Sequence, residues 1–257
     1  MANLIRTFKS GSDWTPNDLL AYNIRVEYQG SQIFFSIANL PQPRVDNEVL
    51  TAPDAAATQH DDSYTLLRIM DLAVAVSPGE ESAVDFVVQL FKVLSYTGRA
   101  VGRVSRTRKD LLFWVCGEQK HAKTDVCIVD ASDILLFAQE DKRHLDGSDP
   151  EPQLIAETIA AFYNKNDTRV RALGLPILQN KVIPGITMKG TMPIFYKIPV
   201  TTELVHAVQL GEYPVQETVV YAHVPTVPRP ARCYGEGMKP LDNRHVILSC
   251  YEAFKFL

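Results

Sequence analysis

The chain has 257 residues, a formal net charge of −4 and 46% hydrophobic residues. This length allows one substantial core with added segments, and the composition is that of an ordinary globular protein. The negative net charge excludes a global basic field, so a polyanionic partner would need a local basic patch. We expect a single domain over residues 1–257.

No part of the sequence favours export or a membrane. The opening MANLIRTFKSGSDW has no apolar run long enough for a signal peptide, and no later run approaches the span of a bilayer. The cysteines at 116, 127, 233 and 250 follow neither a CxxC pattern nor a zinc-ligand spacing. We therefore expect an intracellular protein of the nucleus or cytoplasm, without a membrane partner. A homodimer remains an open possibility.

The N-terminal part, residues 1–62, predicts a mixed wing. Residues 22–28 and 32–37 alternate around Gly30, which predicts a β-hairpin. Residues 45–50 predict a short helix.

Two longer helices are expected next. The first covers residues 62–76, with apolar side chains along one side. The second begins at Ser77-Pro78-Gly79-Glu80, where Ser77 can cap, Pro78 suits the first turn and Glu80 completes a capping box. This second helix is apolar nearly all round, which predicts a core position.

Strands are predicted at residues 100–108 and 111–116, around a turn at Arg108-Lys109-Asp110. A polar loop is expected to follow, up to Lys123. The elements after residue 142 are a helix at 151–163, strands at 186–189 and 193–198, a helix capped by Thr201 or Thr202, a strand at 217–224 and a helix at 246–256. This order predicts an α/β fold in which helices flank a mixed central β-sheet.

The stretch 123–142, KTDVCIVDASDILLFAQEDK, predicts a β-hairpin. A two-residue loop at 131–132 would oppose Asp125 to Ala138 and put Glu140 on the diagonal, roughly 7–8 Å away. Two carboxylates at that separation can hold a divalent cation. A three-residue loop would shift the register by one and turn Asp125 away. Under the two-residue loop, Asp125 shares a face with Ile134, Leu136, Ala138, Glu140 and Lys142.

An Asp followed after about fifteen residues by Glu-x-Lys on a paired strand resembles the PD-(D/E)XK nuclease superfamily. Asp125 and Glu140-Asp141-Lys142 carry the resemblance, and Thr124 stands where the family often has Pro. A second Glu-x-Lys, at 118–120 with Asp110 upstream, is set aside because it is expected in a polar loop.

The resemblance covers about residues 77–200 and implies a restriction-endonuclease-like core. Residues 1–62 would be an N-terminal addition and residues 201–257 a C-terminal one. Residues 14–24 (WTPNDLLAYNI) and 185–199 (GITMKGTMPIFYKIP) also resemble proteins of unassigned function from mushroom-forming fungi, a likeness that implies no activity.

The superfamily resemblance implies a metal-dependent nuclease, a hydrolase of DNA or RNA that uses Mg²⁺ or Mn²⁺. Asp125 and Glu140 would supply carboxylate ligands and Asp141 a backbone carbonyl. Lys142 would orient or deprotonate the attacking water, or stabilise the charge on the phosphate.

The family often adds an acid from the helix before the sheet. Glu81 is the preferred candidate for this catalytic and metal-binding acid, with Glu80 and Asp85 as alternatives. On the following helix, Gln153 resembles the glutamine with which RecB-like members steady the active-site lysine. An exposed first-turn residue is the competing interpretation of Gln153.

A basic cluster precedes the central hairpin and could bind a phosphate backbone. Its members are Arg99, Arg103, Arg106, Arg108 and Lys109, with Lys120, His121 and Lys123 in the segment leading to Asp125.

The competing interpretation of all these residues is structural. Asp125 could be a strand-end acid in solvent, Glu140 and Lys142 a solvated ion pair, and the basic cluster an ordinary solvated face. The corresponding function is a catalytically inactive PD-(D/E)XK-fold binding or assembly module. A metal-free small-molecule enzyme is a third hypothesis, for which no residues stand out.

Overall fold

A seven-stranded mixed sheet forms the centre of the protein, which confirms the predicted α/β class. The computed structural model describes residues 4–74, 80–130, 133–140 and 149–255. The strand order is β1-β9-β8-β7-β6-β5-β2, and β3 pairs with β4 in a separate two-stranded ribbon. The strands are β1 Ile24–Tyr28, β2 Val104–Thr107, β3 Asp110–Val115, β4 Glu118–Lys123, β5 Val126–Val129, β6 Ile134–Glu140, β7 Asn180–Lys189, β8 Met192–Thr201 and β9 Thr218–His223.

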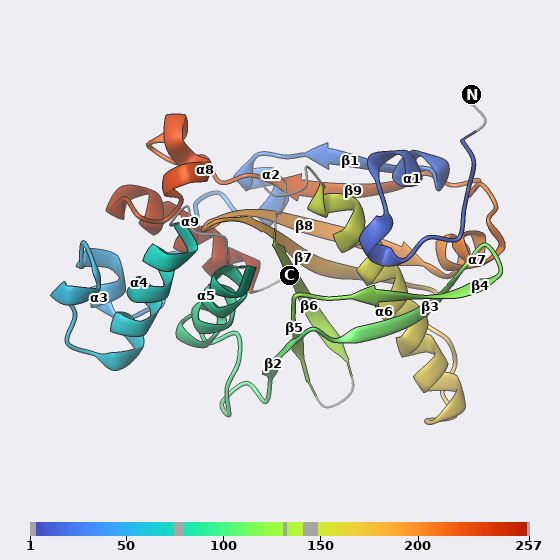
Figure 1. Ribbon diagram of the computed structural model, residues 1–257, viewed down its shortest axis with the longest axis horizontal. Helices are drawn as coiled ribbons and strands as arrows, with labels where there is room; N and C mark the ends of the chain where they lie inside the picture. Colours follow the sequence, from blue (N-terminus) through green and yellow to red (C-terminus); the bar gives the residue numbers. More distant parts are fainter. Residues whose placement is uncertain (1–3, 75–79, 131–132, 141–148, 256–257) are drawn as a thin grey trace.

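Helices cover both faces of the sheet (Figure 1). One group, with α4, α5 and α9, packs on one face, and α1, α6 and α7 pack on the other. The helices are α1 Pro16–Ala21, α2 Ser31–Phe35, α3 Asn47–Thr51, α4 Asp61–Val74, α5 Glu80–Val93, α6 Pro150–Arg171, α7 Thr202–Leu210, α8 Cys233–Glu236 and α9 Leu241–Phe254.

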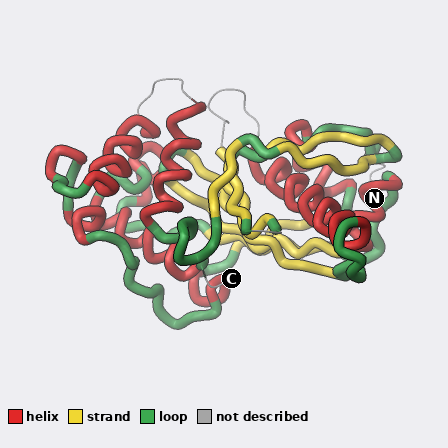
Figure 2. Tube along the Cα trace, turned by 90° about the horizontal axis from the view of Figure 1, so that it is seen from below, coloured by secondary structure: helices red, strands yellow, loops and turns green. Residues whose placement is uncertain are grey.

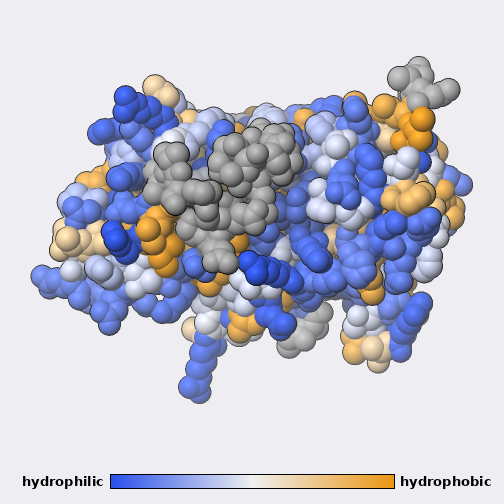
Figure 3. All heavy atoms as spheres, viewed as in Figure 1, coloured by the Kyte–Doolittle hydropathy of each residue, from blue (hydrophilic) through white to orange (hydrophobic). Residues whose placement is uncertain are grey.

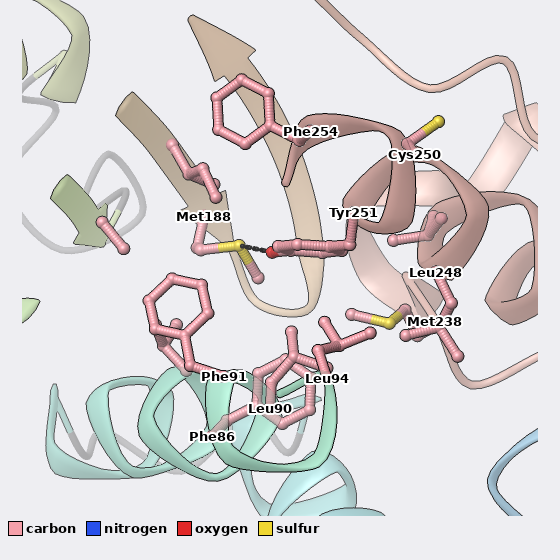
Figure 4. Close-up of a cluster of buried hydrophobic side chains, with 14 of the residues drawn as sticks. Phe86, Leu90, Phe91, Leu94, Met188, Met238, Leu248, Cys250, Tyr251 and Phe254 are labelled. Atoms are coloured by element: carbon pink, nitrogen blue, oxygen red, sulfur yellow. Dashed lines mark hydrogen bonds between the residues drawn. The ribbon is translucent and has the colours of Figure 1, made fainter. Parts of the chain in front are cut away.

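The first core lies between the sheet and the helices α4, α5 and α9 (Figure 4). Phe91 of α5 and Leu94, which directly follows the helix, face Tyr251 of α9 across it. The Tyr251 hydroxyl donates to the sulfur of Met188 on β7 at 3.1 Å. Helix α5 buries Phe86, Val87, Leu90 and Phe91 in this core, which confirms the predicted core helix.

The second core lies between the other face of the sheet and α6. Helix α6 buries an unbroken run of side chains from Leu154 to Phe162. It approaches the sheet closely at Gly185 on β7, where an added Cβ would lie 2.9 Å from a Leu154 methyl carbon. A side chain at this position would push α6 outward, so glycine sets the distance between helix and sheet.

The β6–α6–β7 segment brings the start of α6 to the end of the sheet at which β6 and β7 terminate. Strands β6 and β7 are parallel neighbours, with Phe137 opposite Gly185 and Gln139 opposite Thr187. Because α6 connects two parallel strands, it must run back along the sheet, and its first turns lie near the carboxyl ends of β6 and β7. In open α/β sheets this edge is where ligands bind.

Several predicted elements are confirmed in place. Helices are found at α3, α4, α6, α7 and α9, and strands at β7, β8 and β9. The Thr201 hydroxyl accepts from the backbone N–H of Leu204, which confirms it as the cap of α7. The helix start predicted at residues 77–79 lies outside the described residues.

The predicted N-terminal hairpin is wrong. Strand β1 pairs in parallel with β9, from nearly 200 residues further along the chain, with Ile24 opposite Thr218. Residues after Gly30 form helix α2 instead of a second strand, because Phe34 and Phe35 reach the first core from it. Tertiary burial overrides the strand preference of these residues.

The expected pairing of the strands on either side of Arg108 is also wrong. Strand β2 pairs with β5 and β3 with β4, so the chain leaves the main sheet at Arg108, whose φ is 51°. The predicted polar loop is strand β4, and Cys116 and Gly117 form the turn with positive φ values. Only Ala122 is fully buried on β4, which is why the alternation was not visible.

Figure 2 gives a second view of the same arrangement, with the two-stranded ribbon as a long arm beside the helices of the second core. None of the helices in the described part of the chain has the length and apolar character needed to cross a bilayer.

We predict that Gly185→Ala destabilises the protein by about 1–3 kcal/mol in urea unfolding, because the new methyl group overpacks the α6 contact. Its Cβ would lie 2.9–3.2 Å from side-chain atoms of Leu154 and Ile198. The control is Gly30→Ala, since nothing lies within 4 Å of a Cβ there. Equal effects of the two substitutions would contradict the close approach of α6.

Candidate functional site

The turn between β5 and β6 begins as predicted. The backbone N–H of Asp130 donates to the carbonyl of Asp133 at 3.1 Å, and Val129 lies opposite Ile134. These pairings belong to a two-residue loop, although residues 131–132 themselves lie outside the described chain.

A β-bulge then shifts the register by one residue. The shift falls between Val129 and Ile128, and from there on Ile128 lies opposite Leu136 and Val126 opposite Ala138. Continuing this register places Asp125 opposite Gln139. The predicted pairing of Asp125 with Ala138 is therefore wrong, because the bulge has the same effect as a longer loop. The face that Asp125 was expected to share with Leu136, Ala138 and the position of Glu140 is wrong for the same reason.

The new register directs Asp125 towards α6. Its neighbour in the pairing, Gln139, lies beside Thr187, whose hydroxyl is 3.4 Å from that of Tyr196 in the second core. Asp125 is half-buried at the start of β5. Its negative charge contributes to raising the pKa of Glu157 on α6, so the two carboxyl groups lie near each other.

Glu157 is the most deeply buried acid of this region, with no exposed surface. Burial is the main cause that holds its pKa well above 4.5, and the charge of Asp125 adds to it. The Gln153 side chain donates to Glu157 Oε1 at 3.2 Å. Burial therefore disfavours the charged form of this carboxyl, and a proton or a cation beside it would offset that cost.

Two buried oxygens in this region have no donor among the described residues. They are Glu157 Oε2 and Gln139 Oε1. Buried polar atoms are satisfied in the great majority of cases, so each such atom needs an explanation. We call Asp125, Gln139, Gln153 and Glu157 the acid cluster.

The chemistry of the acid cluster fits a hard divalent cation. Mg²⁺ and Mn²⁺ bind carboxylate and amide oxygens, and Asp125, Glu157 and Gln139 offer these atoms. A cation there would neutralise the charge of the two acids and occupy the unsatisfied oxygens. Without a cation, a proton on Glu157 serves the same purpose.

The structure describes only some of the residues predicted for the site. Glu140 is the last residue of β6, opposite Met188, but its side chain lies outside the described part, as does that of Glu81. Asp141 and Lys142 also lie outside it. Asp85, the alternative helix acid, is exposed on α5.

Gln153 has a defined contact: it is half-buried and bonds Glu157 instead of standing exposed in solvent. Glu157 and Gln139 were not among the residues predicted for the site. A signal for Glu157 exists in the sequence, since it is an acid within the apolar run LIAETIAAF and lies one helical turn after Gln153.

The second Glu-x-Lys sequence does not form a site. It lies on β4 and not in a loop, so the reason for setting it aside was wrong. Asp110 lies opposite Lys123 on one face of the ribbon, whereas Glu118 and Lys120 belong to the other face. Glu118 and Lys120 form an ion pair with each other at 3.0 Å.

The predicted basic residues lie along β2 and the adjoining ribbon. Strand β2 is an edge strand, and Arg106 on it lies opposite Cys127. Figure 3 shows that hydrophilic side chains dominate the visible face around these segments. Within the described residues, Arg99, Arg103, Arg106, Lys109 and Lys123 form no ion pair.

One further group of side chains has metal-ligating atoms close together. Asp46, Glu48 and His60 each place one such atom within 4.8 Å of the others. Glu48 also accepts from the backbone N–H groups of Gln59 and His60 at 2.9 and 3.1 Å. These contacts tie the loop before α4 to α3, which accounts for the cluster.

Comparison with known proteins places the chain in no family: neither a protein-family profile nor a curated protein matches it.

We predict that Glu157 makes the metal-free protein less stable as pH rises. Its pKa is raised on folding, so the unfolded chain releases the proton near pH 4.5 while the folded protein keeps it. The contribution of Glu157 to the free energy of unfolding is therefore constant below about pH 4.5. Above that pH it falls by up to about 1.4 kcal/mol per pH unit, until the pKa of Glu157 in the folded protein is reached.

A glutamine at this position does not titrate, so Glu157→Gln should lack this loss of stability. Its free energy of unfolding should therefore rise relative to that of the wild type as pH rises. In Asp125→Asn the loss of stability with rising pH should be smaller than in the wild type, because the substitution removes a negative charge that helps to raise the pKa of Glu157. Urea unfolding in EDTA measures all three proteins. A constant difference between wild type and Glu157→Gln across pH 4–8 would contradict the assignment.

Proposed function

We propose that this protein is a metal-dependent phosphodiesterase that cleaves DNA or RNA. One observation carries the proposal: two buried oxygens, Glu157 Oε2 and Gln139 Oε1, lack a described donor beside the half-buried Asp125. An arrangement of this kind is costly unless a cation or proton completes it.

The order of elements supports the PD-(D/E)XK resemblance. The segment from α5 to β7 runs helix, strands, helix, strand, with the β3–β4 ribbon inserted between β2 and β5. Strands β2, β5 and β6 are successive antiparallel neighbours and β7 is parallel to β6. The helices α5 and α6 cover opposite faces.

The acid cluster assigns roles to the chain's own residues. Asp125 and Glu157 would hold a Mg²⁺ or Mn²⁺ ion through carboxylate oxygens, and Gln139 through its amide oxygen. The bound cation would supply Lewis-acid activation of water and neutralise phosphate charge. Gln153 would keep Glu157 in place. The position of Glu140 on β6 alternates with that of Gln139, so the acid cluster replaces the Asp125–Glu140 pair that the resemblance implies, while Asp141 and Lys142 keep their implied roles.

The basic residues of β2 support a polyanionic substrate. Between residues 99 and 123 the sequence has seven lysines and arginines against two acids, although the whole chain carries a charge of −4. Phosphate groups could replace the missing counter-charges of Arg106 and Lys109.

A nucleic-acid-binding module without catalysis is the second candidate. The raised pKa of Glu157 favours it, because a protonated carboxyl is a poor cation ligand. Calorimetric titration with MgCl₂ and MnCl₂ separates the two: no binding in the millimolar range, together with no cleavage of any polymer, would establish the second candidate.

We predict that Asp125→Asn and Glu157→Gln each lower Mn²⁺-dependent cleavage by about a hundredfold or more, since each removes a ligand charge while keeping the side-chain shape. Lys142→Ala should abolish it, since the resemblance gives Lys142 the role of activating water, whereas Glu140→Ala should have a smaller effect because the position of Glu140 alternates with that of Gln139 on β6. Cleavage is measured on single-stranded DNA, duplex DNA and RNA, and circular dichroism checks folding.

The second Glu-x-Lys sequence provides the matched control. Glu118→Gln changes an acid of that sequence, and Glu118 lies on the face of the ribbon opposite the one that carries Asp110 and Lys123. It should leave cleavage within about twofold of the wild type. Full activity in Asp125→Asn would rule out the proposed site.

We predict that Arg106→Gln and Lys109→Gln weaken nucleic-acid binding in EDTA without sequence dependence. If each residue contacts one phosphate, the slope of log K against log salt should fall by about 0.7–0.9 per substitution. Arg171→Gln is the control, because Arg171 is exposed and paired with Asp167 at the far end of α6. An unchanged slope in both the Arg106 and the Lys109 variant would exclude these two residues as phosphate contacts.

A further inference from the structure

The β3–β4 ribbon has two faces of different character. Its inner face packs Leu111, Phe113 and Val115 into the second core. Its outer face is made of three registered pairs that alternate with these residues. The outer pairs are Asp110 with Lys123, Leu112 with His121, and Trp114 with Gln119.

The outer face carries large apolar side chains where polar ones are usual. Leu112 and Trp114 are each 39% exposed, and they are successive residues of the same face of β3. His121 lies diagonally across from Trp114, and its Nδ1 bonds the Asp110 carboxylate at 2.8 Å on the same face. Because 39% of Trp114 is exposed, part of its ring is open to a ligand.

The ribbon is held in place at its turn and at its middle. At the turn, the N–H groups of Cys116 and Gly117 donate to the carbonyls of Val208 and Gln209 at the end of α7. Midway along β3, the side chain of Asn164 on α6 donates to the Leu112 carbonyl. The outer face is therefore a fixed platform, so a ligand would not have to order it on binding.

The open end of the ribbon leads to the acid cluster. Thr124 N–H donates to the carbonyl of Lys109, and the N–H of Arg108 donates to the carbonyl of Asp125, at 3.0 and 3.1 Å. Trp114 is four residues from Asp110, a distance of about 14 Å along the strand. Exposed Arg108 and Lys123 flank this end. The surface therefore passes from aromatic to basic to acidic within the length of a few nucleotides.

We propose that the outer face of the β3–β4 ribbon binds single-stranded nucleic acid, with a base stacked on Trp114 and the phosphates directed along Lys123 and Lys109 towards Asp125. The inference rests on the proposed function and names its substrate class. Charge complementarity argues for a nucleic acid as the occupant, since Arg108, Lys109 and Lys123 lie at the open end of the ribbon and the acid of that end, Asp110, is paired with His121 at 2.8 Å.

A single strand is favoured over a duplex because stacking requires an exposed base face. In a duplex the bases already stack on each other, and a flat two-stranded ribbon reaches only phosphates and groove edges. Stacking on an aromatic side chain tolerates any base. The ribbon should therefore bind single strands with little sequence preference.

The experiment uses the two tryptophans of the chain. Trp14 is buried, 4% exposed and stacked on Tyr22, whereas Trp114 is open to solvent. Titration of the full chain with (dT)₁₂ in EDTA should quench tryptophan fluorescence, and Trp114→Phe should lose the quenching while keeping the affinity within about threefold. Affinities come from anisotropy of labelled (dT)₁₂.

Trp114→Ala should bind (dT)₁₂ roughly tenfold or more weakly, because the stacking partner is lost. Tyr64→Ala is the matched control, an exposed aromatic residue on α4 that should not change binding. A 12-base-pair duplex should bind more weakly than (dT)₁₂ and should be insensitive to Trp114→Ala. Equal binding of (dT)₁₂ by wild type and Trp114→Ala, or a preference for the duplex, would overturn the proposal.

The binding experiment and the cleavage experiment fail independently. Binding is measured without a divalent cation, so it does not depend on catalysis. Loss of binding in Trp114→Ala, with no cleavage by the wild type, would support nucleic-acid binding by the ribbon and exclude the proposed nuclease activity. Cleavage that requires Asp125, together with binding that is unchanged in Trp114→Ala, would support the nuclease activity and exclude the ribbon as the binding surface.

Discussion

The burial of Glu157 between its own helix, α6, and the sheet is the constraint on which the candidate site depends. Helix α6 lies so close to the sheet, at Gly185, that the side chains of its second and third turns have no access to water. A carboxyl in this position must be protonated or neutralised by a cation. Gln153, Gln139 and Asp125 are its polar surroundings, and together they make this edge of the sheet chemically distinct.

The position of Asp125 depends on one irregularity in the pairing of β5 with β6. The bulge after Val129 moves Asp125 from Ala138 to Gln139 and hence to the α6 side of the sheet. Because side chains alternate along a strand, a shift of one residue exchanges the faces completely. The acid cluster and the second core therefore share one face, and α5 with the first core occupies the other.

The β3–β4 ribbon is joined directly to the strand that follows Asp125. The chain leaves the main sheet at Arg108, forms β3 and β4, and returns at Thr124 directly before Asp125. Its inner face completes the second core, which fixes its position, and its outer face remains available to a ligand. The proposed binding surface and the proposed cation site are therefore adjacent in the chain, since Thr124 alone separates Lys123 from Asp125.

The sequence by itself determined the α/β class, the places of the longer helices, the hairpin turn near residue 131 and the basic character of residues 99–123. Helical periodicity, caps and turn residues are local signals, and they survive folding unchanged. Tertiary structure alone decided the parallel pairing of β1 with β9, the separate ribbon and the bulge between β5 and β6. It also brought Glu157 and Gln139 to Asp125, because these contacts join residues far apart in the chain, and only the packing of α6 on the sheet selects them.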